Sequence, residues 1–274
     1  MLDVADLKVA FGAAQESRKT VVQNVTFSVK RERVGLIGES GSGKSTIART
    51  LLGILPHNAQ VTASRLSLHG KSLLSLGERE WRRIRGRHVG YIPQDARMAL
   101  NPVMTIERQV AAALRKGQGL SEKAANTASL DALRAVQIRE PAHVAKLFPH
   151  QVSGGMAQRI ITSMILASSP DLLIADEPTS ALDATVRLKI LDLLNALVEQ
   201  HRLGLVLISH DLNLVRRYTD RVIVLYAGRI METCKSDELL NAGHPYTRGL
   251  IACRPSLQRR VEHLPELQRQ ASWG

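Results

Sequence analysis

The sequence is poor in cysteine, in aromatic residues and in long apolar runs, and each shortage excludes a class of protein. Its 274 residues contain two cysteines, Cys234 and Cys253, too few for a disulfide framework and without metal-ligand spacing. A reducing, cytosolic compartment is therefore expected. Aromatic residues make up 3% of the chain and offer few surfaces on which single-stranded nucleic acid could stack. No apolar run approaches the roughly 18 residues of a membrane span, and the amino-terminal stretch lacks the apolar core of a signal peptide.

Acidic residues are also scarce relative to basic ones. The chain has 25 Asp and Glu against 37 Lys and Arg, a formal net charge of +12. Such an excess favours a phosphate-rich ligand, an anionic membrane surface or nucleic acid as partner. No zinc-finger, homeodomain or RNA-binding signature is present, so nucleic acid is not expected. Five arginines lie close to Trp81 in residues 78–88, and the plain interpretation of this stretch is a solvated basic face.

Strands and helices alternate along the chain. Residues 2–11 and 21–30 alternate in polarity and predict antiparallel strands. Buried strands are predicted where apolar runs lead into polar or glycine-rich turns, at 32–38, 88–95, 171–178, 204–211 and 221–230. Helices are predicted at 46–55, where Pro56 would end the helix, and at 105–116, 129–138, 156–169 and 185–201. This order predicts an α/β core with a mainly parallel sheet, interrupted by a helical insertion at about 95–155.

The segment "GESGSGKS" (38–45) fits the pattern G-x-x-x-x-G-K-[ST], between a predicted strand and a predicted helix. Backbone N–H groups in such a loop, together with the start of the helix, hold phosphates. Lys44 would reach the β- and γ-phosphates, and Ser45 would hold Mg²⁺. The residues predicted to bind nucleotide here are Gly38, Glu39, Ser40, Gly41, Ser42, Gly43, Lys44, Ser45 and Thr46.

Four further side chains suit the same chemistry. Asp176, at the end of the apolar segment "LLIAD", would hold the Mg²⁺ shell. Glu177 follows it and could polarise the attacking water. Gln94 ends a predicted strand, and its neutral amide could bind Mg²⁺ and water. His210 ends another, and its imidazole could contact the γ-phosphate.

These segments, with "VSGGMAQ" (152–158) and "SALD" (180–183), occur in the order found in ABC-transporter nucleotide-binding domains. The chain resembles that family over almost its whole length. The resemblance implies a RecA-like P-loop NTPase core with an antiparallel β subdomain and an inserted α-helical subdomain. It also implies an ATP-binding domain at 1–250, with its helical subdomain at about 95–155, followed by a short tail at 251–274.

The resemblance also assigns roles that residue patterns alone do not. Phe11 would stack on adenine. Two ATPase subunits would pack head to tail, so that "VSGGM" of one subunit caps the γ-phosphate bound by the other, and Asp183 would let the two sites sense each other. Val152 replaces the family's usual leucine, with little effect expected. The residues expected to face the partner's ATP are Ser153, Gly154, Gly155 and Met156, the last standing where many relatives have glutamine.

Finer similarity indicates one branch of the family. "QDARMALNPVMTI" (94–106) and "HPYTRGL" (244–250) resemble segments of oligopeptide, dipeptide and nickel importer ATPases. Ala96 departs from the branch's usual proline, so the loop toward the permease could differ. The cysteine cluster of many peptide-branch members is missing, and no iron–sulfur cluster is expected. The short tail is more like that of the nickel and metallophore members.

The resemblance therefore implies an ATP-hydrolysing subunit, using ATP and Mg²⁺, of an importer of peptides, nickel or metal chelates. Implied partners are a second, related ATPase, two transmembrane permeases that contact residues 94–105, and an extracytoplasmic solute-binding protein. The expected location is the cytoplasmic face of the cell (inner) membrane. An alternative is the ATPase of a soluble complex for carbon–phosphorus bond cleavage. Translation and DNA-repair ABC proteins are disfavoured because they usually carry duplicated cassettes or long coiled coils.

Overall fold

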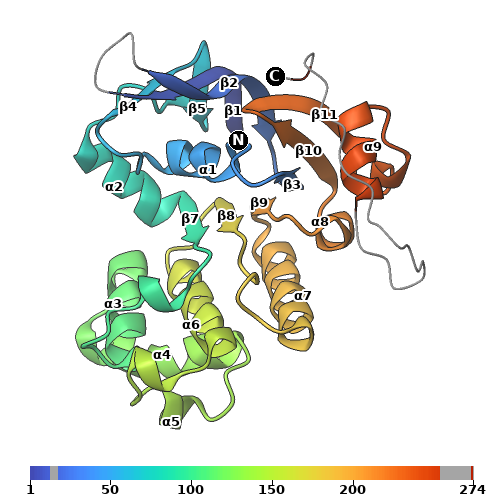
Figure 1. Cartoon of the computed structure of the whole chain (residues 1–274). Coiled ribbons are helices and arrows are strands. Elements are labelled where there is room, and N and C mark those ends of the chain that lie inside the picture. The colour runs from blue at the N-terminus through green and yellow to red at the C-terminus, as the bar shows by residue number, and fades with distance from the viewer. Residues whose placement is uncertain (13–17, 254–272, 274) are drawn as a thin grey trace. The chain divides into compact units, whose positions relative to one another are not determined.

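The computed structural model describes residues 1–12, 18–253 and 273, and the chain divides into two compact units. Unit 1 comprises Met1–Leu76 and Val206–Gly274, and unit 2 comprises Gly77–Leu205. The elements of both are labelled in Figure 1. Most of the predicted tail, residues 254–272 and 274, lies outside the described residues.

Unit 1 contains an antiparallel sheet and a second group of strands. In the second group two strands pair in parallel, and one of these also forms a hairpin with a third strand. Its elements are β1 (Leu2–Phe11), β2 (Lys19–Val29), β3 (Arg33–Gly38), α1 (Lys44–Leu52), β4 (Ala59–Thr62), β5 (Arg65–Leu68), β6 (Lys71–Ser72), α8 (Leu212–Tyr218), β10 (Arg221–Tyr226), β11 (Arg229–Lys235) and α9 (Pro245–Ala252). The antiparallel sheet has the order β2-β1-β5-β6, and β4 also pairs with β1. β3 pairs in parallel with β10, which pairs antiparallel with β11.

The antiparallel sheet follows from the polarity of β1. Leu2, Val4, Leu7 and Val9 are buried, and the residues around them are at least partly exposed. The alternation changes phase at Asp6, which has a φ of 52° and lies where the register with β2 shifts between Val4 and Leu7. A bulge at this position returns the apolar side chains to the buried face. The predicted antiparallel strands are thus confirmed, whereas β4, β5 and β6 were not predicted.

Two predicted boundaries in unit 1 were wrong. Helix α1 ends at Leu52, before Pro56, because the N–H of Gly53 donates to the carbonyl of Thr50 and so caps the helix. The segment 221–230, predicted as one strand, is a hairpin. Its turn consists of Ala227 and Gly228, which both have positive φ, as a type I′ hairpin turn requires.

Unit 2 contains a parallel strand pair and a group of helices. Its elements are α2 (Glu78–Arg87), β7 (Val89–Ile92), α3 (Ile106–Gln118), α4 (Glu122–Ala135), α5 (Pro141–Val144), α6 (Gly154–Leu166), β8 (Leu172–Asp176) and α7 (Ala184–His201), and β9 (Gly204–Ile208) crosses into unit 1. β7 and β8 pair in parallel. α3, α4 and α6 pack on one another around a shared apolar cluster that includes Ile106, Leu133 and Ile160. Figure 1 shows these helices as one group.

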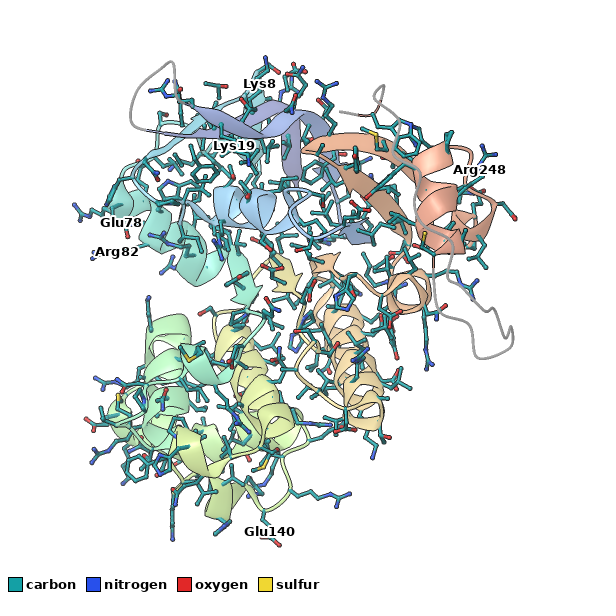
Figure 2. All side chains as sticks on the ribbon, viewed as in Figure 1. Lys8, Lys19, Glu78, Arg82, Glu140 and Arg248 are labelled. Carbon is teal, nitrogen blue, oxygen red and sulfur yellow. The ribbon has the colours of Figure 1, made fainter. Side chains whose placement is uncertain are left out.

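The arginine-rich stretch around Trp81 forms α2. Glu78 at its start accepts from Arg82 at 3.3 Å and from Arg85 at 2.5 Å, and Figure 2 shows Glu78 and Arg82 together on the helix. The pair with Arg82 is an i,i+4 pair of exposed charges, which stabilises a helix only slightly. The exposed arginines of α2 are Arg79, Arg82, Arg83 and Arg87, which confirms the solvated basic face.

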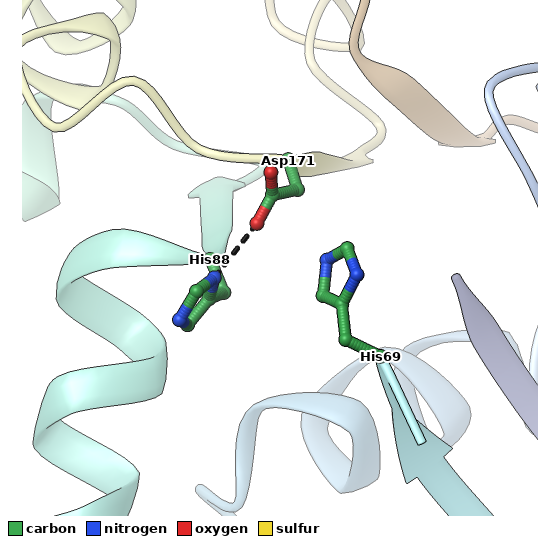
Figure 3. A group of neighbouring side chains, drawn as sticks. All are labelled: His69, His88 and Asp171. Carbon is green, nitrogen blue, oxygen red and sulfur yellow. Dashed lines mark hydrogen bonds and ion pairs between the residues drawn. The ribbon is translucent and has the colours of Figure 1, made fainter. Parts of the chain in front are cut away.

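The start of β7 is tied to the start of β8 by side chains as well as by backbone. The Nδ1 atom of His88 lies 2.7 Å from a carboxylate oxygen of Asp171, as Figure 3 shows. The carbonyl of His88 also accepts from the N–H groups of Asp171 and Leu172. These bonds fix the register of the two strands whose far ends carry the predicted catalytic residues.

The predicted fold class is confirmed: parallel strands alternate with helices, an antiparallel sheet lies in unit 1 and a helical group in unit 2. The domain limits at 1–250 and 95–155 stay predictions. Throughout residues 1–12 and 18–253, no helix has both the length and the hydropathy required to cross a bilayer.

Candidate functional site

The glycine-rich loop of unit 1 connects the buried strand β3 to α1 and encloses a positive charge. Lys44 is 7% exposed, and its Nζ donates to the carbonyls of Gly38 at 2.8 Å and Glu39 at 2.7 Å and to Oγ of Ser42 at 3.4 Å. The loop therefore curls around the ammonium group. Helix α1 begins at Lys44, and the N-terminus of a helix carries partial positive charge. Both features favour an anion at this loop.

Gly38 is required where β3 enters the loop. Its φ is 150°, and a Cβ atom there would lie 2.1 Å from the carbonyl oxygen of Leu225 in β10. Any side chain at this position would push the loop off the neighbouring strand. The close approach of loop and β10 thus fixes where the phosphate loop begins.

Two acids lie at the end of β8 in unit 2. Asp176 is 5% exposed, and its carboxylate accepts from the hydroxyl of Tyr91 on β7 at 3.3 Å. Glu177 follows with a φ of 46°, the left-handed region that costs a residue with a side chain free energy. The backbone N–H and hydroxyl of Ser180 both donate to the Glu177 carbonyl, at 3.2 and 3.1 Å, and hold this turn. The chain therefore turns directly after the strand, at the residue predicted to act as the base.

Unit 2 also contains a cavity of about 320 Å³ formed by three segments. They are the loop after β7, the start of α6, and the connection from β8 to α7. The lining residues are Gln94, Asp95, Ala96, Arg97, Ser153, Gly154, Gly155, Gln158, Pro178, Ala181, Leu182, Asp183 and Val186. Five residues predicted as functional, Gln94, Ser153, Gly154, Gly155 and Asp183, are therefore brought together in one place.

The start of α6 faces this cavity. Ser153 is its N-cap, and the hydroxyl oxygen accepts from the N–H of Met156 at 3.2 Å. The two glycines after it are close to the α7 segment: a Cβ at Gly155 would lie 2.8 Å from a methyl carbon of Val186. Larger residues there would separate α6 from α7. The small residues thus leave the N-terminus of α6, with its partial positive charge, open to the cavity.

Asp183 has a local role of its own. It is the N-cap of α7, and one carboxylate oxygen accepts from the N–H groups of Thr185 at 3.1 Å and Val186 at 3.0 Å. Replacing such a cap by alanine costs about 1 kcal/mol. Asp183 therefore stabilises the start of α7, and its role in communication between two ATP sites stays a prediction.

The comparison with known proteins decides the family. The model of a family described as "ABC transporter" matches residues 22–180. This chain belongs to that family.

Relatives and solved structures extend the assignment to most of the chain. The "Dipeptide transport ATP-binding protein DppD" of Escherichia coli (strain K12) is 38% identical over 269 residues, which cover 97% of this chain and 82% of that protein. The protein of the same name from Bacillus subtilis (strain 168) is 40% identical over 260 residues, covering 94% and 77%. A solved dimer of the ATP-binding cassette MJ0796, bound to ADP and Pi, matches with a TM-score of 0.75 and 27% identity over 86% of this chain and 99% of that one. This member of the ABC family is an ATP-hydrolysing transport ATPase.

The site residues predicted for an ABC ATPase are distributed over both units. Unit 1 carries the phosphate loop, Phe11 at the half-buried end of β1, and His210, which is exposed. Unit 2 carries Gln94, Asp176 and Glu177. Gln94 and His210 were expected to end strands, but β7 and β9 stop at Ile92 and Ile208 and leave both residues in loops. That the two groups meet at one ATP stays a prediction.

Sequence reasoning missed two side chains of unit 2. Tyr91 bonds Asp176, and Gln158 lines the cavity. Gln158 is 3% exposed, and its amide nitrogen has no hydrogen-bond partner within the described part of the chain. A signal for Gln158 was present, since it follows Gly154 by one helical turn and so lies on the same face of α6. Met156, by contrast, packs against the apolar cluster of the helical group.

Proposed function

We propose that this chain powers the uptake of peptides through partner permeases by binding and hydrolysing ATP together with a second ABC ATPase. The relatives are named as dipeptide transport proteins, which favours peptides over the nickel and metal-chelate cargoes considered from the sequence. The ATPase of a soluble carbon–phosphorus cleavage complex is the alternative function.

The observation that carries the proposal is that one chain presents two separate anion-accepting features. The phosphate loop with buried Lys44 belongs to unit 1, and the α6 start with its cavity belongs to unit 2. A chain with two such features suits a head-to-tail dimer, in which Ser153 and the glycines after it cap an ATP held by the partner's loop. The solved MJ0796 cassette is itself a dimer with ADP and Pi, which supports this arrangement.

The residues of the proposed ATP site fit Mg²⁺ as well as nucleotide. Ser45, Gln94 and Asp176 offer hydroxyl, amide and carboxylate oxygens, the ligands that Mg²⁺ prefers. Bound Mg²⁺ would neutralise charge on the phosphates. Glu177 would orient and deprotonate water, His210 would contact the γ-phosphate, and Phe11 would stack on the adenine.

The proposed permease contact includes the loop after β7. Met98 is 84% exposed and Val103 is 78% exposed. Apolar side chains so fully exposed mark an interaction surface when they are grouped. They fall within residues 94–105, the segment predicted to contact two transmembrane permeases at the cytoplasmic face of the cell (inner) membrane. An extracytoplasmic solute-binding protein would deliver the peptide.

No iron–sulfur cluster is proposed. Burial raises the pKa of the Cys234 thiol, and the neighbouring carboxylates of Glu232 and Glu238 raise it further. A raised pKa disfavours the thiolate that metal ligation needs. Cys253, the other cysteine, lies in the short turn after α9.

The proposal is tested by purifying the chain from its native membrane in mild detergent and identifying the subunits by mass spectrometry. Two multi-span membrane proteins and a second ABC ATPase are expected to co-purify. A soluble complex without any membrane protein would overturn the transport assignment and favour the carbon–phosphorus cleavage alternative.

Replacing Lys44 by alanine is expected to weaken ATP binding itself, because it removes the charge enclosed by the phosphate loop. Hydrogen bonds involving a charged group contribute about 1.5–3 kcal/mol, which corresponds to roughly a 10- to 100-fold rise in Kd. Isothermal titration calorimetry with ATP and Mg²⁺ measures the Kd of each variant. Lys123→Ala on the exposed face of α4 is the control and should bind ATP normally; equal affinities in the two variants would contradict the assignment.

Replacing Tyr91 by phenylalanine is expected to weaken the binding of Mg²⁺ rather than the binding of ATP. The hydroxyl bonds the Asp176 carboxylate, and the loss of one such bond amounts to about 0.5–1.5 kcal/mol. The Mg²⁺ concentration for half-maximal ATP hydrolysis should rise roughly 2- to 10-fold. Tyr218→Phe, on α8 of unit 1, is the control. An unchanged Mg²⁺ requirement in Tyr91→Phe would show that the hydroxyl does not orient the metal-binding carboxylate.

A further inference from the structure

The segment "HPYTRGL" (244–250) contains none of the residues proposed to bind or hydrolyse ATP, yet its first residues are held in unit 1 by several hydrogen bonds. His244 is the N-cap of α9, and its Nδ1 accepts from the N–H of Tyr246 at 3.1 Å. The carboxylate of Glu232 on β11 accepts from the N–H groups of Gly243 at 2.7 Å and His244 at 3.3 Å. Figure 1 shows α9 beside β11, in agreement with their contacts. The start of α9 is therefore fixed to the hairpin, and the position of Tyr246 with it.

The ring of Tyr246 is completely buried in an aromatic group. Its centroid lies 4.6 Å from that of Tyr226 and 5.7 Å from that of Trp273, with interplanar angles of 51° and 67°. Trp273 also meets Tyr226 nearly edge-on, at 6.0 Å. Tilted and edge-to-face pairs at these distances are favourable and directional. The ring therefore has little freedom to turn its hydroxyl elsewhere.

The hydroxyl of Tyr246 bridges the phosphate loop and β10. It accepts from the backbone N–H of Glu39 at 3.3 Å and donates to the carbonyl of Leu225 at 3.4 Å. Leu225 is also the residue against which Gly38 packs without space for a side chain. The carbonyl of Glu39 in turn accepts from Lys44. One hydroxyl thus binds both the first residues of the loop and the neighbouring strand β10, at the junction where the loop begins.

We propose that Tyr246 is a positioning residue that holds the phosphate loop in its ATP-binding shape, and that Trp273 fixes the tyrosine ring. The inference rests on the proposed role of this loop in binding ATP. A loop already held in its bound shape loses less conformational entropy when the phosphates arrive. Both hydrogen bonds are long, so their removal should have a moderate effect on affinity and none on the chemical step.

The test compares Tyr246→Phe with Tyr226→Phe. Each variant retains its ring in the same aromatic group, but only the first removes the bridge between Glu39 and Leu225. Tyr246→Phe should raise the Kd for ATP and the KM roughly 2- to 10-fold while kcat stays within about twofold of the parent, and Tyr226→Phe should leave all three unchanged. Thermal unfolding without nucleotide is measured alongside. A lower Tm in Tyr246→Phe with unchanged Kd and KM would reduce the hydroxyl to a structural role and overturn the proposal.

Lys44→Ala separates failure of this inference from failure of the proposed function. If Lys44→Ala weakens ATP binding and Tyr246→Phe does not, only the positioning role is wrong. If neither variant affects ATP binding, the loop is not the ATP site and both proposals fail.

The role of Trp273 is tested by a double-mutant cycle. Trp273→Ala should weaken ATP binding in the same direction as Tyr246→Phe, because it frees the ring. Since the two residues would act through one hydroxyl, the double variant should be weakened by less than the product of the two single effects. Effects that multiply fully would show that Trp273 does not act through Tyr246.

Discussion

Replacement of Glu177 by glutamine is expected to abolish steady ATP turnover while ATP binding remains. The amide has the size of the carboxylate but cannot accept the proton of the attacking water. General-base catalysis contributes typically about 10²- to 10⁴-fold, and kcat should fall by that factor. Lys44, which the loop encloses, and Asp176, which Tyr91 holds, are untouched by the change. The variant should therefore retain ATP and stay in the closed dimer, which size-exclusion chromatography with ATP and Mg²⁺ can detect.

The backbone at Glu177 requires a matched control. Its φ of 46° is unusual for a residue with a side chain, and a substitution could act through the turn instead of the chemistry. Glu140 has a similar φ of 50°, is exposed, and lies in the helical part of the chain, as Figure 2 shows. Glu140→Gln makes the same chemical change on the same kind of backbone and should hydrolyse ATP at the parent rate. Normal turnover in Glu177→Gln would refute its assignment as the base.

Local sequence patterns predicted the elements that carry the chemistry. The buried strand before the phosphate loop and the strand that contains Asp176 are present as expected, because each is a short apolar run bounded by glycine or acid, and a helix follows the loop. The errors lie at boundaries decided by contacts. Capping by Gly53 shortens α1, and the turn at Ala227 and Gly228 divides β10 from β11. The strands β4 to β6 are two to four residues long, too short for a periodic pattern to reveal.

The site residues that the sequence did not reveal act through tertiary contacts. Tyr91 and Asp176 belong to neighbouring strands, and their bond depends on the parallel register of β7 and β8. Tyr246 and Glu39 are separated by 207 positions, and no spacing rule connects them. By contrast, the serine and glycines of "VSGGM" form one contiguous segment, and the family resemblance assigned their role from that segment. Local chemistry could thus be predicted, whereas the side chains that orient it could not.

The cap of α6 supports the proposal that the cavity of unit 2 accepts a partner's nucleotide. Ser153 caps α6 and Asp183 caps α7, so two helices begin at the same cavity. The Asp183 carboxylate offsets the partial positive charge at the start of α7, whereas the start of α6 has a neutral cap and no acid in its first turn. The cap hydroxyl of Ser153 is exposed and could exchange its bond with Met156 for one to a phosphate. A γ-phosphate from a second subunit would therefore meet donors that are already oriented.

Substitution of Ser153 by arginine in one chain of a mixed dimer, whose other chain is unchanged, is expected to remove the ATP bound at the partner's loop and leave the ATP at the chain's own loop. The larger side chain would fill part of the 320 Å³ cavity, and overpacking costs about 1–3 kcal/mol. Affinity at the affected site should fall roughly 10- to 100-fold. As a separate single variant of the same chain, Lys44→Ala should have the opposite effect and remove only the ATP bound at the chain's own loop. The number of molecules of a non-hydrolysable ATP analogue retained per dimer provides the measurement.

Combining the two substitutions in one chain makes the outcome decisive. The dimer must contain one variant chain and one unchanged chain. If the cavity serves the partner's ATP, each single variant then retains one nucleotide per dimer and the double variant retains none, because the two changes affect different sites. If the cavity served the chain's own ATP, both changes would affect one site and the double variant would still retain one nucleotide. His150→Arg adds the same side chain three positions earlier, at an exposed residue that does not line the cavity, and should retain two. One retained nucleotide in the double variant would therefore exclude the head-to-tail arrangement and confine both anion-accepting features to the same ATP.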